Sequence, residues 1–222
     1  MTSLYRRTTR MLAHQNLLGY ESAEVIDTVF TKTWDRYQPS KFDNSELLNV
    51  INRLRPHTVL DFGGGAGVHY KQAQASIDIP IRWAIVETPS MTIYCNHNTR
   101  AVDLHWFTSI AFAKYWLKNV DLVLCNGALQ YTSDPIAIAN ELAALNAREL
   151  LYQRLRFDQP NDIESSWLSD HGPGPAWGPE AVVHVQRTRI DREAFFMAHN
   201  AYHDIQHTST PNQVLFQCPT ST

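Results

Sequence analysis

The stretch Asp61-Phe62-Gly63-Gly64-Gly65-Ala66-Gly67 restricts the fold of this chain more than any other segment. It follows residues 58–62, a short apolar run typical of a strand, and it precedes residues 68–75, which have helical character. Glycines at a strand-to-helix junction permit positive φ angles and allow a ligand to approach the backbone. The first N–H groups of the following helix are free to donate to such a ligand. The sequence therefore predicts a nucleotide-binding turn.

Apolar runs and helical patterns alternate through most of the remaining chain. Further strands are expected at 81–87, 104–107, 121–126 and 149–153, and helices at 21–34, 44–54, 91–97 and 135–145. This alternation predicts an α/β fold, a Rossmann-like doubly wound sheet with mostly parallel strands. A helix from about Asp191 and two last strands, 202–207 and 213–218, are expected to add an antiparallel C-terminal edge.

The length of 222 residues fits a single-domain protein. We expect residues 1–55 to form an N-terminal helical segment that packs on a core formed by residues 56–222. Residues 158–179 contain four prolines and three glycines, and a loop of this length is typical of a lid or a binding loop. Its Trp167, His171 and Trp177 are expected either to form an aromatic acceptor pocket or to pack the loop onto the domain.

Composition excludes several classes of protein. The formal net charge of −3 gives no electrostatic basis for a nucleic-acid partner. Cys95, Cys125 and Cys218 are odd in number and lack CxxC spacing, so neither a disulfide framework nor a zinc ribbon is indicated. No apolar run reaches the ~18 residues that a membrane span requires. We therefore expect a soluble protein of a reducing, cytoplasmic compartment.

Two details of the glycine turn separate the candidate cofactors. A dinucleotide site follows the template G-x-G-x-x-G, which places a pyrophosphate on the turn. If it starts at Gly63, this template requires glycine at position 68, which is Val68. The chain has instead the pattern acid-x-G-x-G-x-G, beginning at Asp61. S-adenosylmethionine (SAM) carries an α-ammonium group, a sulfonium cation and no phosphate, so the acidic residue favours SAM over a dinucleotide.

Two further elements support the same ligand. Glu87 closes the second strand 26 positions after Asp61 (87 − 61), where an acid can accept hydrogen bonds from both ribose hydroxyls. Met91 follows where its side chain can pack on adenine, and Asn126-Gly127 ends the fourth strand. Ligands of open α/β sheets bind beyond the carboxyl ends of the strands, at the point where the strand order reverses. All of these residues are expected at that point.

At these residues the sequence resembles the class I SAM-dependent methyltransferases, and more narrowly a bacterial family of methyltransferases of unassigned substrate. The matching segments are Gly19-Tyr20-Glu21, the block from Val59 to Tyr70, Trp83 to Glu87, and Asn126-Gly127-Ala128-Leu129-Gln130-Tyr131 with Asp134-Pro135. Together they extend through most of residues 19–156. Where such families have a strand followed by Arg-Thr-Pro, this chain reads Gln153-Arg154-Leu155-Arg156, so the resemblance assigns no substrate role to that stretch.

The resemblance implies a methyltransferase domain over residues 56–222 and a set of cofactor contacts. It places Asp61, Gly63 and Gly65 around the methionine moiety, Glu87 on the ribose, and Asn126-Gly127 near the sulfonium. Thr108 or Ser109 would lie near the adenine, and Tyr20 would close over the cofactor. The full set of expected cofactor-binding residues is Tyr20, Asp61, Gly63, Gly64, Gly65, Gly67, Glu87, Thr88, Met91, Thr108, Ser109, Asn126 and Gly127.

Methyl transfer is a displacement at an already activated carbon, so alignment of the acceptor contributes most, up to ~7–11 kcal/mol of the barrier. A general base contributes roughly 10²–10⁴-fold and is needed only when the nucleophile carries a proton. No catalytic dyad is evident in the sequence. Tyr131 and His69 each flank a cofactor-binding element, and either is a candidate to contact the acceptor or remove its proton. The expected product is S-adenosylhomocysteine (SAH), and the acceptor is a small molecule or a glycan- or lipid-linked intermediate.

Three alternatives remain open at this point. The chain could be an NAD(P)-dependent oxidoreductase, which Val68 and Asp61 disfavour, or a catalytically inactive binding module with the same fold. His199, His203 and His207 recur every four residues and would form a metal-ligand face on one continuous helix. The segment 202–208 has the pattern of a strand instead, so we expect scattered histidines and no metal.

Overall fold

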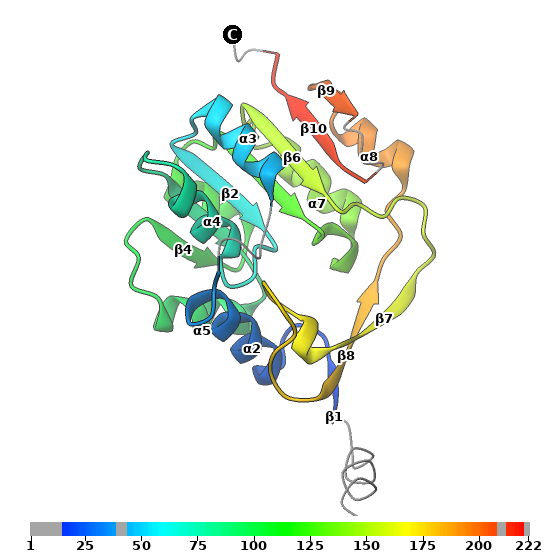
Figure 1. Ribbon diagram of the computed structural model, residues 1–222. Coiled ribbons are helices and arrows are strands. Elements are labelled where there is room, and N and C mark those ends of the chain that lie inside the picture. The colour runs from blue at the N-terminus through cyan, green and yellow to red at the C-terminus, as the bar shows by residue number, and fades with distance from the viewer. Residues whose placement is uncertain (1–14, 39–43, 208–211, 220–222) are drawn as a thin grey trace, which may run out of the picture.

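The larger of two sheets contains seven strands in the order β4-β3-β2-β5-β6-β10-β9 (Figure 1). The computed structural model describes residues 15–38, 44–207 and 212–219. Neighbouring strands are parallel from β4 to β6, whereas β10 is antiparallel to both β6 and β9. The strands are β2 (Thr58–Phe62), β3 (Arg82–Val86), β4 (Leu104–Phe107), β5 (Leu122–Asn126), β6 (Glu149–Gln153), β9 (His203–His207) and β10 (Val214–Gln217). The predicted doubly wound sheet with an antiparallel edge is confirmed.

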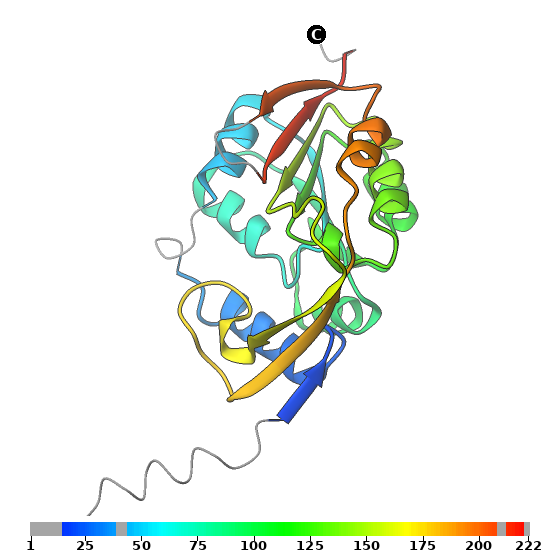
Figure 2. The same ribbon diagram turned by 90° about the vertical axis from the view of Figure 1, so that its right-hand side faces the viewer.

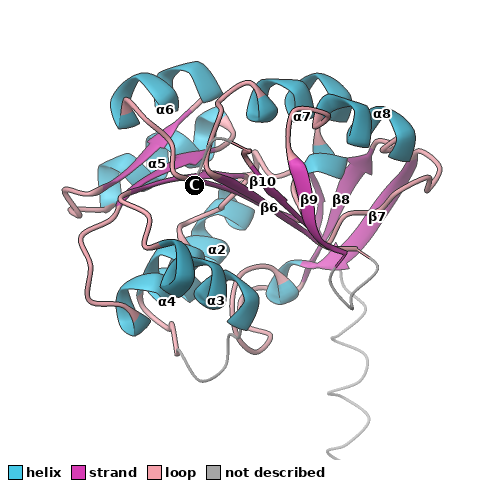
Figure 3. Cartoon of the chain, turned by 90° about the horizontal axis from the view of Figure 1, so that it is seen from above, coloured by secondary structure: helices cyan, strands magenta, loops and turns pink. Residues whose placement is uncertain are grey.

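Helices cover both faces of this sheet (Figure 3). On one face, α3 (Ser45–Leu54), α4 (Val68–Ser76) and α5 (Pro89–Asn98) pack against Val59, Trp83 and Leu122. On the other face, α6 (Ile110–Leu117), α7 (Pro135–Ala143) and α8 (Arg192–Ala198) pack against Leu60 and Val123. Successive strand residues thus enter opposite cores, which explains why the central strands are continuously apolar. The helix α6 was not predicted.

Four of the described helices are capped by a polar side chain, and three of these, α3, α7 and α8, were predicted from the sequence. The side chains of Asn44, Asp134 and Asp191 accept hydrogen bonds from the backbone N–H three residues on, at 3.2, 2.9 and 2.9 Å. Such caps satisfy N–H groups that have no partner inside the helix. In addition, α2 (Ala23–Trp34) lies over the glycine turn, where the Trp34 indole donates to Ala66 O at 2.9 Å.

A second, smaller sheet lies beyond the carboxyl ends of the parallel strands (Figures 1 and 2). Its order is β1-β8-β7, built from β1 (Gln15–Leu18), β7 (Asp162–Trp167) and β8 (Ala181–Arg187). Val183 and Val185 of β8 pack with Val25 of α2 and Leu168 of the short 3₁₀ helix η4 (Leu168–Asp170). Strand β1 is parallel to β8, and β7 is antiparallel to it.

This small sheet corrects two predictions. The loop predicted at 158–179 contains a strand and a 3₁₀ helix, and the N-terminal segment predicted to be helical contains a strand at 15–18. The sequence of β7, Asp-Ile-Glu-Ser-Ser-Trp, alternates half-buried and exposed positions but is mainly polar, so its alternation does not show as apolar against polar. A domain boundary between residues 55 and 56 stays a prediction. No helix in the described ranges is both long and apolar enough to cross a membrane.

The three histidines spaced by four residues do not share a helix. Helix α8 ends at Ala198, and β9 begins at His203. His199 is 1% exposed and uses both ring nitrogens, since Nδ1 lies 2.8 Å from Phe195 O and Nε2 lies 2.8 Å from the Tyr152 hydroxyl. Its ring stacks on Phe216 with centroids 4.4 Å apart. His199 is therefore a core residue rather than a ligand of a metal.

We expect this buried histidine to make the fold sensitive to acid. Burial lowers the pKa of His199 to about 4 from its ordinary value of 6.5. Between these values the unfolded chain binds a proton that the folded chain does not, so stability falls as pH decreases from 6.5 towards 4. The loss between pH 7 and pH 5 is about 2 kcal/mol from this residue.

Urea unfolding at pH 7 and pH 5 measures this effect. The double variant Tyr152→Phe/His199→Phe removes the titrating ring and the hydroxyl that it would leave unpaired. We expect the double variant to lose about 2 kcal/mol less stability than the wild type between the two pH values. An equal loss in both proteins would show that His199 does not carry the pH dependence.

Candidate functional site

The glycine turn joins β2 to α4 at the carboxyl end of the sheet, as predicted. Gly63, Gly65 and Gly67 have φ angles of 69°, 58° and 90°, a region in which residues with a Cβ are strained. A Cβ at Gly63 would lie 2.1 Å from the Cβ of Ala128, which follows β5. The turn after β2 and the turn after β5 are therefore in direct contact. Strand order reverses between these two strands, so the turn occupies the switch point of the sheet.

Asp61 lies beneath the turn. Its side chain is fully buried, and its Oδ2 accepts from Trp83 Nε1 at 3.3 Å and lies 3.1 Å from His69 Nδ1. A Cβ on Gly64 would lie 2.4 Å from the same oxygen, so the backbone covers the carboxylate. Oδ1 is buried and has no hydrogen-bond partner among the described residues. The predicted role of Asp61 near the methionine moiety stays a prediction. Because the backbone covers the carboxylate, Asp61 would attract the ligand electrostatically across the turn and would not contact it directly.

A chain of hydrogen bonds leads from Asp61 to the end of β6. His69 Nε2 lies 3.0 Å from Asn126 Nδ2, and Arg154 Nε donates to Asn126 Oδ1 at 2.6 Å. Arginine can only donate, so it fixes Oδ1 of the amide as the acceptor and Nδ2 as the donor. His69 Nε2 must then accept, and its Nδ1–H donates to Asp61. His69 is 5% exposed and both ring nitrogens face protein groups, so the structure argues against the predicted role of His69 as the base.

Glu87 is joined directly to the glycine turn. Its two carboxylate oxygens accept from Gly65 N at 2.9 Å and from Thr88 N at 2.8 Å. Burial raises the pKa of Glu87, while these two backbone hydrogen bonds oppose the rise. The side chain is half-buried, and each oxygen keeps a lone pair for a further donor. The structure thus brings Glu87 and the turn together.

The remaining predicted cofactor contacts lie around this centre. Thr88 precedes α5, and its hydroxyl is buried without a partner among the described residues. Met91 is 3% exposed in the core, with its sulfur 3.5 Å from Cys95 Sγ, so little of it is open to an adenine ring. Ser109 caps α6 and accepts from Phe112 N at 3.3 Å, and Thr108 is exposed. Gly127 has a φ of 71° at the end of β5.

Tyr131 and Tyr20 form one wall of the site where the two sheets meet. Tyr20 packs edge-on against Tyr131 and His171, with ring centroids 5.5 and 5.7 Å apart. The Tyr131 hydroxyl donates to Glu164 of β7. Burial, and to a smaller extent this hydrogen bond to Glu164, raises the pKa of Tyr131 to about 12. Tyr131 is therefore protonated at neutral pH and acts as a donor rather than as a base.

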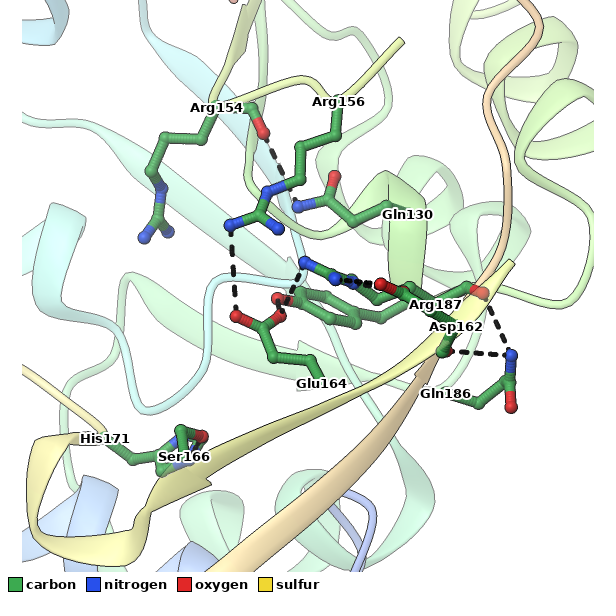
Figure 4. A network of polar contacts seen from close by, with 10 residues as sticks. Gln130, Arg154, Arg156, Asp162, Glu164, Ser166, His171, Gln186 and Arg187 are labelled. Carbon is green, nitrogen blue, oxygen red and sulfur yellow. Dashed lines mark hydrogen bonds and ion pairs between the residues drawn. The ribbon is translucent and has the colours of Figure 1, made fainter. Parts of the chain in front are cut away.

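Glu164 is a candidate that the sequence analysis missed. It lies in a polar network on the inner side of β7 and β8 (Figure 4). Arg187 Nη1 and Arg156 Nη2 lie 3.5 and 3.9 Å from its carboxylate, and Arg187 also forms a two-point pair with Asp162. The one sequence signal for Glu164 is the alternation of half-buried and exposed positions along residues 162–167. Because most of these residues are polar, this alternation is not visible in the sequence.

Trp167, His171 and Trp177, expected either to form an acceptor pocket or to pack the loop onto the domain, have different surroundings. His171 lies beside Tyr20, its Nε2 is 2.9 Å from Ser166 Oγ, and burial lowers its pKa. Trp167 is 45% exposed, and Trp177 packs beneath the Arg36 guanidinium at 4.0 Å. Of the three, His171 contacts Tyr20, and the choice between pocket and packing stays a prediction. Among the described residues, no three His, Cys, Asp or Glu side chains are grouped as a metal ion would require.

Comparison with solved structures identifies the fold. CalS10, an amino pentose methyltransferase from Micromonospora echinaspora solved with SAM bound, is 15% identical with a TM-score of 0.53, and the match covers 82% of this chain and 94% of that chain. The sugar N-methyltransferase KedS8 from Streptoalloteichus sp ATCC 53650 is 13% identical with a TM-score of 0.53, over 98% and 92%. A SAM-dependent methyltransferase from Clostridium acetobutylicum is 9% identical with a TM-score of 0.51, over 85% and 96%.

This chain therefore has the fold of the class I SAM-dependent methyltransferases. No protein-family model matches the sequence, and no curated protein is significantly similar to it. The likeness thus concerns the arrangement of the strands and helices, while the function of the site has to be argued from its own residues.

The contact between Gly63 and Ala128 can be tested by substitution of the glycine. We expect Gly63→Ala to destabilise the protein by about 2 kcal/mol more than Gly19→Ala, because overpacking at a rigid contact typically costs ~1–3 kcal/mol. Gly19 is a matched control, since its φ is 70° against 69° at Gly63, but a Cβ there would meet nothing within 4 Å. Chemical unfolding measures both variants. Equal losses would show that backbone strain alone, and not the contact with Ala128, requires glycine at position 63.

Proposed function

We propose that this protein is an enzyme that transfers a methyl group from SAM to a small-molecule acceptor and releases SAH. The observation that carries the proposal is the pair formed by Glu87 and the glycine turn. A half-buried carboxylate, held by Gly65 N at 2.9 Å, borders a turn with positive φ angles at the switch point. The fold, which is that of SAM-dependent methyltransferases, supports the same function.

The residues of the site fit this cofactor. The Cα of Gly65 is bare, and a Cβ there would meet only Val29 Cγ1 at 3.6 Å. Glu87 has the acceptor lone pairs that two ribose hydroxyls need, and the backbone of Gly63 to Gly65 would border the methionine moiety. When bound, SAM supplies a methyl group on a sulfonium, so the protein has to position the acceptor rather than activate the carbon. Asn126-Gly127 would border the sulfonium.

The competing cofactor fits less well. A diphosphate on this turn would lie close to Glu87 and above Asp61, two carboxylates, whereas the ammonium and sulfonium of SAM are attracted to them. Position 68, where a dinucleotide site has its third glycine for close packing of the helix, is also occupied by valine. A binding module without turnover would keep the cofactor contacts but would need no proton acceptor beside them.

Glu164 is the group that we propose as proton acceptor for the methylated atom. Tyr131 orients the carboxylate, and Tyr20 and His171 close the same side of the site. Tyr131 and Tyr20 would also exclude water from the acceptor. The amino pentose and sugar acceptors of the structural neighbours support a hydroxylated or amino-bearing small molecule, free or glycan- or lipid-linked.

The proposed setting is the bacterial cytoplasm, with no nucleic-acid acceptor. Cys95 and Cys125 are buried free thiols, which supports a reducing compartment. The net charge of −3 supports an uncharged or cationic small molecule over a polyanion.

Titration calorimetry with SAH tests the cofactor site. We expect Glu87→Ala to weaken SAH binding by roughly 10- to 100-fold, because hydrogen bonds to a charged group contribute ~1.5–3 kcal/mol. Glu141→Ala removes the same charge from the exposed face of α7 and should leave the affinity unchanged. Wild-type protein that binds NADH and not SAH would reverse the assignment in favour of an oxidoreductase.

Transfer of a labelled methyl group from SAM to amino sugars and hydroxylated small molecules tests the acceptor side. We expect Glu164→Gln to lower kcat by roughly 10²- to 10⁴-fold, the range of a lost general base, and Tyr131→Phe to lower it less, while SAH affinity changes less than about twofold in both variants. SAH binding without transfer to any acceptor would favour the binding module. Unchanged kcat in both variants would remove these residues from the mechanism.

A further inference from the structure

The guanidinium of Arg154 is an unmatched positive charge beside the proposed cofactor site. Its Nε and Nη2 donate to Asn126 Oδ1 and Asn126 O at 2.6 and 2.9 Å, and both acceptors are uncharged. Within the described ranges, no carboxylate lies at ion-pair distance from Arg154, whereas Arg156 and Arg187 both face Glu164. Figure 4 shows Arg154 and Arg156 projecting from the same segment, with Arg156 above Glu164 and Arg154 apart from it.

This guanidinium is held in place before any ligand arrives. Arg154 has a φ of 54°, a left-handed conformation that residues other than glycine rarely adopt. A Cβ on Gly127 would lie 2.9 Å from the guanidinium, so glycine at that position allows the side chain to lie flat on the backbone. The next residue, Leu155, is 1% exposed and anchors this segment in the core. The site thus presents an oriented cation whose Nη1 has no partner among the described residues.

The position of this cation is next to the glycine turn. Asn126 ends β5, and Ala128, two residues further on, meets Gly63 of the turn. Through Asn126 and His69, Arg154 is also joined to Asp61 beneath the turn. A negative charge and a positive charge therefore lie at opposite ends of one hydrogen-bonded chain.

We propose that Arg154 binds the α-carboxylate of the cofactor's methionine moiety, an inference that rests on the proposed function. SAM carries two cationic groups and one anionic group. Asp61 complements the cationic groups, Glu87 accepts from the ribose hydroxyls, and Arg154 complements the carboxylate. Two guanidinium N–H groups are used by Asn126, and the remaining ones form the fork that carboxylates favour. The resemblance assigned no role to residues 153–156, so this function comes from the geometry alone.

Comparison of two ligands isolates the carboxylate. SAH and 5′-methylthioadenosine share the adenosine and the thioether, but the second lacks the amino-acid portion. We expect Arg154→Leu to weaken SAH binding about tenfold or more and to leave binding of 5′-methylthioadenosine within twofold, as measured by calorimetry. Arg154→Lys keeps the charge without the two-point attachment to Asn126 and should fall between the wild type and Arg154→Leu.

Arg156→Leu is the matched control, because it removes the same charge two residues away on the same segment. It should bind both ligands as the wild type does. If Arg154→Leu weakened the binding of both ligands equally, the site would be damaged and the proposal overturned. Unchanged SAH binding in Arg154→Leu would also overturn it, and would leave an anionic group of the acceptor as the partner of Arg154. Wild-type protein that binds neither ligand would overturn the proposed function itself.

Discussion

The buried carboxylate of Asp61 is the constraint around which the site is built. An unpaired charge in a protein interior costs several kcal/mol, so its neighbours must supply donors. Trp83 of β3 and His69 of α4 do so at 3.3 and 3.1 Å. Arg154 fixes Asn126 Oδ1 as an acceptor, so Asn126 Nδ2 donates to His69 Nε2 and His69 Nδ1–H faces the carboxylate. Asp61 thus shares one network with residues of β3, α4 and β5 and with Arg154, which follows β6, and glycine at position 64 leaves room for the carboxylate.

The small sheet shows how residues distant in sequence form a single wall. Strand β1 comes from the N-terminal part of the described chain, whereas β7 and β8 follow β6, and the three pair into one layer. Val183 and Val185 of β8 point into a hydrophobic cluster with Val25, while Glu164 and Ser166 of β7 present polar groups to Tyr131 and His171. Glu164 is paired with Val185 and Ser166 with Val183, so the polar and the apolar side chains lie on the same face of the small sheet. The same layer therefore stabilises α2 and lines the site.

Strands with strong local patterns were predictable from the sequence, and pairings between distant residues were not. Residues 58–62 and 149–153 were predicted to the residue, because both faces of these strands are buried and three of the five residues in each form a hydrophobic run or nearly so. These residues are Val59, Leu60 and Phe62 in the first strand and Leu150, Leu151 and Tyr152 in the second. Asp61, Glu87 and Asn126 were expected at the carboxyl ends of their strands, and they lie there. The pairing of Asp61 with His69 and of Asn126 with Arg154 depends on side-chain direction, which no local pattern encodes. For that reason the sequence did not show that both ring nitrogens of His69 face protein groups, and it assigned no role to Glu164 or Arg154.

The charges of the site favour one kind of ligand on physical grounds. Glu87 is half-buried, which raises its pKa, and its carboxylate accepts from two backbone N–H groups. A diphosphate would add negative charge where the carboxylate is least screened, while a ligand with two hydroxyls and nearby cations would replace the lost hydration. The positive charge of Arg154 lies at the other turn, where two hydrogen bonds hold it on Asn126. The separation of these charges therefore suits a zwitterion attached to a nucleoside better than a dinucleotide.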